Sequence, residues 1–287
     1  MRELAATRNV TMRFGPVTAV DSVSLTVGGG EVVGLLGANG AGKTTVIRLL
    51  LGLVRPSQGD VSLFGAPPSM ATRRRIGYVP QTLGLYDDLT VEENWTFTAS
   101  AFDSPRLALP PSIGDVRNHL VGTLPLGLQR RVAFAVAFSH QPELLVLDEP
   151  TSGVGTLNRA RLWQDIRDSA EHGTGVLVTT HNMGEAEQCD RLIVMAGGRV
   201  IAEGTVADVI GDRHVVEVTC DGWQEAFSIL DAEGLIVQVH GDVLRVPASP
   251  EHVEELFARH HLRGEVVTVL ANLEEAFVSI VSAGATG

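Results

Sequence analysis

The chain has 287 residues, enough for two domains of about 150 residues each or for one large α/β domain. Its apolar fraction of 44% and charged fraction of 20% allow a sizeable core and exclude global disorder. The net charge of −12 argues against binding nucleic acid through general electrostatics, and the one dense basic run, Arg73–Arg75, is too short to make such a surface.

The cysteine content and the hydropathy pattern indicate the compartment. Cys189 and Cys220 cannot form a disulfide framework, and so few cysteines are typical of a reducing environment. No stretch reaches the about 18 uninterrupted apolar residues of a membrane span. The N-terminus lacks the apolar core of a signal peptide. We therefore expect a soluble intracellular protein.

Strands alternate with helices over roughly the first two hundred residues. Period-two alternation predicts a half-buried strand over 23–27, a hairpin turn at 28–30 and a fully buried strand over 31–36. The following segments are expected in this order: a helix over 45–54, a loop over 55–60, strands over 61–64 and 76–80, a helix with a Thr90–Glu93 capping box, a loop over 103–114, a helix over 128–138, a strand over 144–147, a helix over 158–171 and a strand over 176–180. This alternation predicts an α/β domain with a mainly parallel sheet.

The pattern changes near residues 211–212, where a second and smaller domain is expected. Its predicted elements are strand 214–220, helix 223–232, strand 235–240, strand 243–247, helix 250–260, strand 265–270 and helix 272–282. The first six form the β-α-β-β-α-β order of ferredoxin-like domains. We therefore predict a larger domain over 1–211 and a small α+β domain over 212–287.

Residues 37–44 match the phosphate-loop pattern G-x-x-x-x-G-K-[ST] in full, between a predicted strand and a predicted helix. Glycines let backbone N–H groups turn inward around phosphate oxygens, and the helix N-terminus adds a favourable dipole. Lys43 can reach the β- and γ-phosphates of a nucleotide, and the Thr44 hydroxyl can ligate Mg²⁺. The expected nucleotide-binding residues here are Gly37, Ala38, Asn39, Gly40, Ala41, Gly42, Lys43, Thr44 and Thr45.

Two carboxylates follow the buried strand over 144–147. Asp148 can hold Mg²⁺ through oxygen ligands, and Glu149 is placed to act on an attacking water as general base. The alternative is that both acids simply meet solvent at a strand end. Downstream of a complete phosphate loop, the catalytic interpretation is favoured.

Taken together, these motifs resemble the nucleotide-binding subunit of an ATP-binding cassette (ABC) transporter, over residues 1–211. The resemblance implies a P-loop NTPase core with an inserted helical subdomain over about residues 88–140. It also implies that Phe14 stacks on adenine, that Gln81 touches Mg²⁺ or the attacking water and faces the membrane partner, and that His181 senses the γ-phosphate. The respective alternatives are a core aromatic, an ordinary loop glutamine and a surface histidine.

Three features depart from the family pattern. The signature segment, usually Leu-Ser-Gly-Gly-Gln, is here Leu-Pro-Leu-Gly-Leu over 124–128, so Pro125 removes a hydroxyl and a backbone donor and Leu126 adds bulk. This segment is also similar to a Leu-Pro-Leu-Gly variant of some export-type members. Gly155 stands where an aspartate normally reaches across the dimer, and the helical subdomain is short. We expect slow hydrolysis as a result.

The resemblance implies an ATPase subunit that uses ATP and Mg²⁺ to power export of a drug, antibiotic or lipid-like substrate. Its expected partners are separate transmembrane permease subunits and a second ATPase protomer, identical or not. We expect it to be cytoplasmic, peripheral on the inner face of the cell membrane. A first alternative is a regulatory or scaffold subunit of a heterodimer with weak or no hydrolysis. A second is an ABC ATPase of translation or DNA repair, which the single cassette and acidic charge disfavour.

Overall fold

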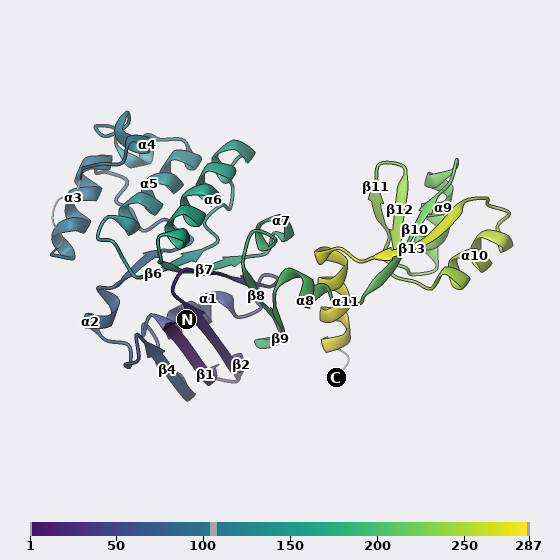
Figure 1. Ribbon diagram of the computed structural model, residues 1–287, viewed down its shortest axis with the longest axis horizontal. Helices are drawn as coiled ribbons and strands as arrows, with labels where there is room; N and C mark the ends of the chain where they lie inside the picture. The colour runs from purple at the N-terminus through teal and green to yellow at the C-terminus, as the bar shows by residue number, and fades with distance from the viewer. Residues whose placement is uncertain (1, 104–107, 286–287) are drawn as a thin grey trace. The chain divides into compact units, whose positions relative to one another are not determined.

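The computed structural model of the protein describes residues 2–103 and 108–285, the last three without their side chains (Figure 1). The chain divides into two compact units, residues 1–205 and 206–287. The sequence instead predicts a boundary at 211/212. The difference arises because helix α8 (Val206–Ile210) contacts α11 (Leu273–Ala285) of the second unit.

The first unit begins with a three-stranded antiparallel sheet of order β2-β1-β4, made of β1 (Glu3–Phe14), β2 (Val17–Gly28) and β4 (Gln58–Leu63). The predicted hairpin turn at 28–30 is wrong, because β2 pairs with β1 and not with the strand that follows it. The loop predicted over 55–60 is also shorter than expected, since β4 starts at Gln58. Local composition could not reveal these pairings with β1, which are set between distant segments.

The second sheet of this unit has six strands in the order β5-β6-β7-β3-β8-β9. Its strands are β5 (Ile76–Val79), β6 (Leu144–Asp148), β7 (Gly175–Thr180), β3 (Val32–Leu36), β8 (Arg191–Ala196) and β9 (Arg199–Gly204). All neighbours are parallel except β8 and β9. Every residue of β3, β6 and β7 is buried, as expected for central parallel strands. The predicted mainly parallel sheet is confirmed.

Helices pack against this sheet and connect its strands. Helix α1 (Lys43–Leu50) packs between the two sheets through Val46, Ile47 and Leu50, and ends four residues before the predicted end at 54. Helix α6 (Thr156–Glu171) packs on β3 and β7, and short helices α2 (Met70–Arg73) and α7 (Met183–Ala186) follow β4 and β7. Because β3, β6 and β7 are parallel, the segments that follow them lie side by side at one edge of the sheet.

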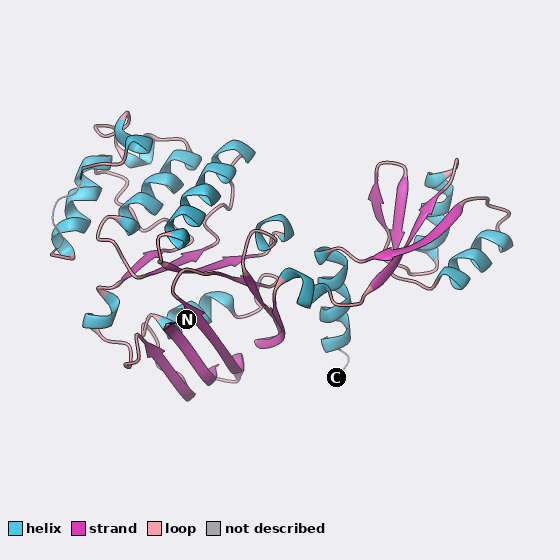
Figure 2. Cartoon of the chain, viewed as in Figure 1, coloured by secondary structure: helices cyan, strands magenta, loops and turns pink. Residues whose placement is uncertain are grey.

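The part between β5 and β6 is helical (Figure 2), with α3 (Val91–Ala101), α4 (Pro111–Gly114), a 3₁₀ turn η1 (Val121–Thr123) and α5 (Leu126–Phe138). It has its own apolar cluster, which includes Val91, Trp95 and Val132. The predicted Thr90–Glu93 capping box is present at the start of α3. The loop predicted over 103–114 contains α4, and its residues 104–107 lie outside the described residues.

The second unit follows the predicted β-α-β-β-α-β order. Its elements after α8 are β10 (His214–Thr219), α9 (Trp223–Ala232), β11 (Gln238–His240), β12 (Val243–Val246), α10 (Pro250–Arg259), β13 (Glu265–Leu270) and α11. The antiparallel sheet has the order β11-β12-β10-β13, and α9 and α10 contribute Leu230 and Phe257 to its core. The expected small α+β domain is confirmed, with β11 three residues shorter than predicted. Among the described residues, no helix has the length and apolarity needed to cross a bilayer.

The two cysteines should differ in reactivity. Cys189 is 5% exposed, and burial raises the pKa of its thiol to about 12. Cys220 is only half-buried, and burial raises its thiol pKa less markedly. Because the thiolate is the nucleophile, we expect iodoacetamide at about pH 8 to modify Cys220 well before Cys189 in the folded protein. Mass spectrometry of timed samples measures this, with urea-unfolded protein as the control; equal rates in the folded protein would contradict it.

Candidate active site

The glycine loop joins the end of β3 to the first residue of α1. Gly42 caps α1 with φ of 102°, and a Cβ there would lie 2.7 Å from the carbonyl oxygen of Ala19. Only glycine fits both this backbone and this close approach. Ala38, Asn39 and Gly40 are exposed at the loop tip, whereas Gly37 and Ala41 are buried at its base. The loop therefore exposes its backbone where a ligand can approach it.

Lys43 lies under this loop and is 6% exposed. Its Nζ donates to the carbonyl oxygens of Gly37 at 2.7 Å and Ala38 at 3.2 Å, and lies 3.8 Å from Glu149 Oε1. Burial lowers the pKa of Lys43, and the charges of Glu149 and Asp148 partly offset this. Because the two carbonyls are neutral and Glu149 lies 3.8 Å away, phosphate oxygens in the loop would bring negative charge closer to this buried ammonium.

Asp148 ends β6 and is 2% exposed. Thr44 Oγ1 donates to its Oδ2 at 3.1 Å, and Thr179 Oγ1 of β7 donates to its Oδ1 at 2.6 Å. The described residues contain no cluster of three or more His, Cys, Asp or Glu side chains suited to a metal. A carboxylate and a hydroxyl instead fit Mg²⁺, which takes one or two protein ligands together with phosphate oxygens and water.

Glu149 is the point where three other segments meet. Gln81 Nε2 donates to Glu149 Oε2 at 3.4 Å, and His181 Nδ1 lies 3.3 Å from Oε1. The Glu149 side chain is 12% exposed and its φ is 49°, a left-handed conformation that glutamate rarely adopts. Its backbone N–H donates to Thr179 Oγ1 at 2.9 Å, which fixes this turn. The strained backbone aims the carboxylate at Lys43 and the glycine loop.

The structure therefore brings several of the site residues predicted from the sequence into contact with Glu149 or Asp148. Lys43, Gln81 and His181 contact Glu149, while Thr44 contacts Asp148. Thr45 is the third residue of α1 and is half-buried. Phe14 ends β1 with 47% of its surface exposed, so the alternative of a core aromatic is wrong. In the described part of the chain, Phe14 forms no hydrogen bond or ion pair with this group.

The variant signature segment starts α5. Pro125 is the N-cap and Leu126, 41% exposed, is the first helical residue. Gly127 has a packing role, because a Cβ there would lie 2.5 Å from Nδ2 of Asn158 on α6. Gly155 precedes α6, and a Cβ there would meet nothing within 4 Å. The missing aspartate is therefore not a consequence of packing within this chain.

Sequence reasoning missed two buried charged groups. Glu185 of α7, 5% exposed, accepts hydrogen bonds from Thr151 Oγ1 and, at 2.8 Å, from Thr180 Oγ1, with Arg159 Nε at 3.5 Å. It thus links the segment after Glu149 to the strand end before His181. Arg130 of α5 is 6% exposed, and its Nε and Nη1 have no partner among the described residues. Burial lowers its pKa, with the charge of Glu149 opposing this shift.

No short sequence motif identifies Glu185 or Arg130 as part of the site. Thr151 and Glu185 are 34 positions apart in sequence, so only the fold shows that they meet. Thr179, a further site residue that was not predicted from the sequence, could more readily have been detected, because a hydroxyl at the carboxyl end of a strand beside Asp148 is suited to orient that carboxylate.

Comparison with known proteins agrees with this geometry. A family model described as ABC transporter matches residues 20–152. The chain is 43% identical over 227 residues to Nod factor export ATP-binding protein I of Burkholderia lata, a match that covers 75% of this chain and 73% of the relative. The chain belongs to the ABC transporter ATP-binding family.

Two further members of the family extend the comparison. The chain is 38% identical over 214 residues, 70% of its length, to the probable multidrug ABC transporter ATP-binding protein YbhF of Escherichia coli K12, and this match spans only 37% of that relative. A solved structure of an ATP-binding subunit of an ABC transporter matches with a TM-score of 0.66 and 30% identity, covering 72% of this chain and 91% of that one. The predicted ABC ATPase fold is confirmed.

Proposed function

We propose that the protein binds and hydrolyses Mg·ATP to power export through separate transmembrane permease subunits. The observation that carries this proposal is the Glu149 carboxylate, held beside the buried Lys43 and the glycine loop by Gln81 and His181. The names of the relatives, which refer to Nod factor and multidrug export, support the direction of transport. A drug, antibiotic or lipid-like molecule is the proposed class of substrate.

In this proposal residues 37–45 hold the triphosphate. The loop N–H groups and the N-terminus of α1 bind the phosphate oxygens, and Lys43 neutralises the β- and γ-phosphates. The exposed ring of Phe14 stacks on adenine. Thr44, Asp148 and Gln81 are the residues that would hold Mg²⁺, which supplies charge neutralisation on the phosphates.

Glu149 is the proposed general base. It accepts a proton from water as the water oxygen bonds to the γ-phosphorus and the bond between that phosphorus and the ADP oxygen breaks. Gln81 and His181, which contact the two oxygens of Glu149, orient this water and the γ-phosphate. Lys43 stabilises the negative charge that develops on the phosphoryl oxygens.

A second protomer, identical or homologous, is proposed to complete the site. Its signature segment would approach the γ-phosphate through Gly127 and the start of α5, with Pro125 and Leu126 weakening that contact. We infer slow hydrolysis from this change and from Gly155. We further propose that the C-terminal domain, residues 212–287, acts in stability or dimerisation.

The membrane partner is proposed to dock beside Gln81. A cavity of about 300 Å³ lies between the sheet and the helical subdomain, where Tyr78, Leu83 and Leu85 line it with Thr98 and Phe102. Leu83 of its lining is two positions after Gln81, so a segment seated there can influence the side chain that contacts Glu149. This arrangement gives the protein a cytoplasmic, peripheral location on the inner face of the membrane.

Binding of a fluorescent ATP analogue to a Lys43→Ala variant tests the proposed function. Loss of a charge-assisted contact to phosphate should weaken binding by about 10- to 100-fold. Arg48→Ala is the matched control, because Arg48 lies on the same helix but is exposed. Equal affinities of wild type and Lys43→Ala would overturn the proposal, as would equal weakening by Arg48→Ala.

A further inference from the structure

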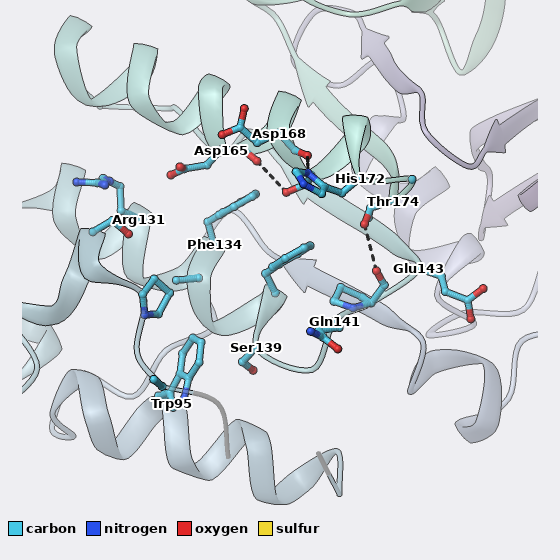
Figure 3. A pocket seen from close by; sticks show the side chains of 18 residues that line it. Trp95, Arg131, Phe134, Ser139, Gln141, Glu143, Asp165, Asp168, His172 and Thr174 are labelled. Carbon is cyan, nitrogen blue, oxygen red and sulfur yellow. Dashed lines mark hydrogen bonds between the residues drawn. The ribbon is translucent and has the colours of Figure 1, made fainter. Parts of the chain in front are cut away.

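A second cavity, of about 730 Å³, lies between α5 and α6 (Figure 3). Its lining includes Glu143 and Thr174, which directly precede β6 and β7, whereas Asp148 and His181 lie at or after the other ends of these strands. The cavity is therefore at the opposite edge of the parallel sheet from the glycine loop. Its volume falls within the range of about 300–1,000 Å³ that small-molecule sites occupy.

The α5 side of the cavity is aromatic. Phe134 and Phe138 are one helical turn apart, with ring centroids 6.3 Å apart and an interplanar angle of 4°. Figure 3 shows Phe134 in the middle of the cavity and Trp95 of α3 on its lower side. Parallel rings with a third aromatic nearby form a surface on which a flat ring can stack.

The α6 side is acidic. Asp165 and Asp168 are one turn apart, and neither forms a salt bridge with a described residue. Burial raises the pKa of Asp165, the charge of Asp168 raises it further, and that of Arg131 opposes the shift. Glu143, by contrast, is neutralised by Arg75 at 2.5 Å and by Arg2 at 3.1 Å. Asp165 and Asp168 are thus carboxylates of the cavity that form no ion pair with the described residues. The charge of Arg131 offsets that of Asp165 in part, and the exposed Asp168 accepts a hydrogen bond from Gln164 Nε2 at 2.7 Å.

One donor in the cavity also lacks a partner. Arg131 of α5 has a buried Nε that forms no hydrogen bond with the described residues. Figure 3 shows its side chain on the same side of the cavity as Asp165. A ligand that carries an ammonium group, a flat ring and an acceptor oxygen could therefore pair with the two carboxylates, stack on the phenyl rings and accept a hydrogen bond from Arg131 Nε.

We propose that this cavity is a binding site for a cationic alkylamine that carries a flat aromatic ring. The protonated amine pairs with Asp165 and Asp168, and the ring stacks on Phe134 and Phe138. An acceptor oxygen on the ligand receives the N–H of Arg131. The site needs neither nucleotide nor a second protomer.

Binding there has a consequence for the ATPase, which rests on the proposed function. α5 starts at the signature segment and α6 follows Gly155, so the ligand contacts the two helices whose first residues face the partner's ATP in that proposal. A ligand that prefers one separation of these helices shifts ATP hydrolysis without competing for the glycine loop.

The test uses the full chain without nucleotide and quinacrine, a fluorescent acridine with a protonated alkylamine and a methoxy oxygen. Fluorescence anisotropy should show saturable binding, and Asp165→Asn with Asp168→Asn should weaken it by about tenfold or more, because the double variant removes both negative charges and the half-buried Asp165 is only partly screened by water. Glu171→Gln is the matched control, since Glu171 is exposed on α6 and does not line the cavity. It should leave the affinity unchanged, as should Lys43→Ala.

Several results would overturn the proposal. Quinacrine that fails to saturate, or that binds the double Asn variant as tightly as the wild type, removes the role of the two carboxylates. Acridone, which is neutral, or the anionic dye ANS should bind at least about tenfold more weakly; equal affinity contradicts a site for cations. Weakening by Lys43→Ala would place the probe at the glycine loop instead. Circular dichroism of each variant verifies folding.

Discussion

Replacing Glu149 with glutamine is expected to lower ATP hydrolysis by about 10²- to 10⁴-fold, the usual contribution of a general base. Glutamine has nearly the same shape and can occupy the 12% exposed position between Gln81, His181 and Lys43. It cannot accept the proton of the attacking water. ATP binding should therefore remain close to that of the wild type, because Lys43 and the glycine loop are unchanged.

Phosphate release by the protein with its membrane partner measures the rate, and a fluorescent ATP analogue measures binding. Glu187→Gln is the control: Glu187 directly follows α7, is exposed, and contacts none of the four site residues Lys43, Gln81, Glu149 and His181 through a described hydrogen bond or ion pair. It should hydrolyse ATP at the wild-type rate. If Glu149→Gln leaves an already negligible rate unchanged, the regulatory or scaffold subunit becomes the better interpretation of this chain.

The sequence predicts the parts of this site that are local in the chain. The glycine loop is eight consecutive residues between a strand and a helix, and Asp148 and Glu149 are adjacent at the end of a buried strand. The parallel sheet then brings these segments to one edge, which follows from β3 and β6 running in the same direction. Local pattern and sheet topology together therefore predict the phosphate loop and its carboxylates.

Contacts between distant segments could not be predicted from the same patterns. The hairpin expected at 28–30 fails because antiparallel pairing with β1 buries the alternate residues of β2 equally well. Gln81 and His181 have no local feature that indicates Glu149 as their partner; only the family resemblance suggested them. From its residue type, Arg130 would be expected on the surface of a helix, yet it is only 6% exposed within α5.

The Glu185 cluster shows how much of the site's support is non-local. A Glu185→Ala variant should be strongly destabilised, because the hydroxyls of Thr151 and Thr180 would lose a buried acceptor. A buried polar group left without a partner costs about 1–3 kcal/mol, so the free energy of unfolding should fall by about 2–6 kcal/mol for the two together. Arg159 adds less to this, since its side chain as a whole is 38% exposed, although the Nε that faces Glu185 at 3.5 Å is buried.

Urea unfolding monitored by circular dichroism measures the change, and Glu187→Ala is the matched control. Glu187 is exposed and two residues further along, so its variant should stay within about 0.5 kcal/mol of the wild type. Glu185→Gln separates the two roles of the carboxylate, because its amide oxygen can still accept from one threonine while its charge is lost. We expect its stability to lie between those of the wild type and Glu185→Ala. A Glu185→Ala variant as stable as the control would show that Thr151 and Thr180 find other acceptors, and that the strand ends carrying Glu149 and His181 are held in place without this link.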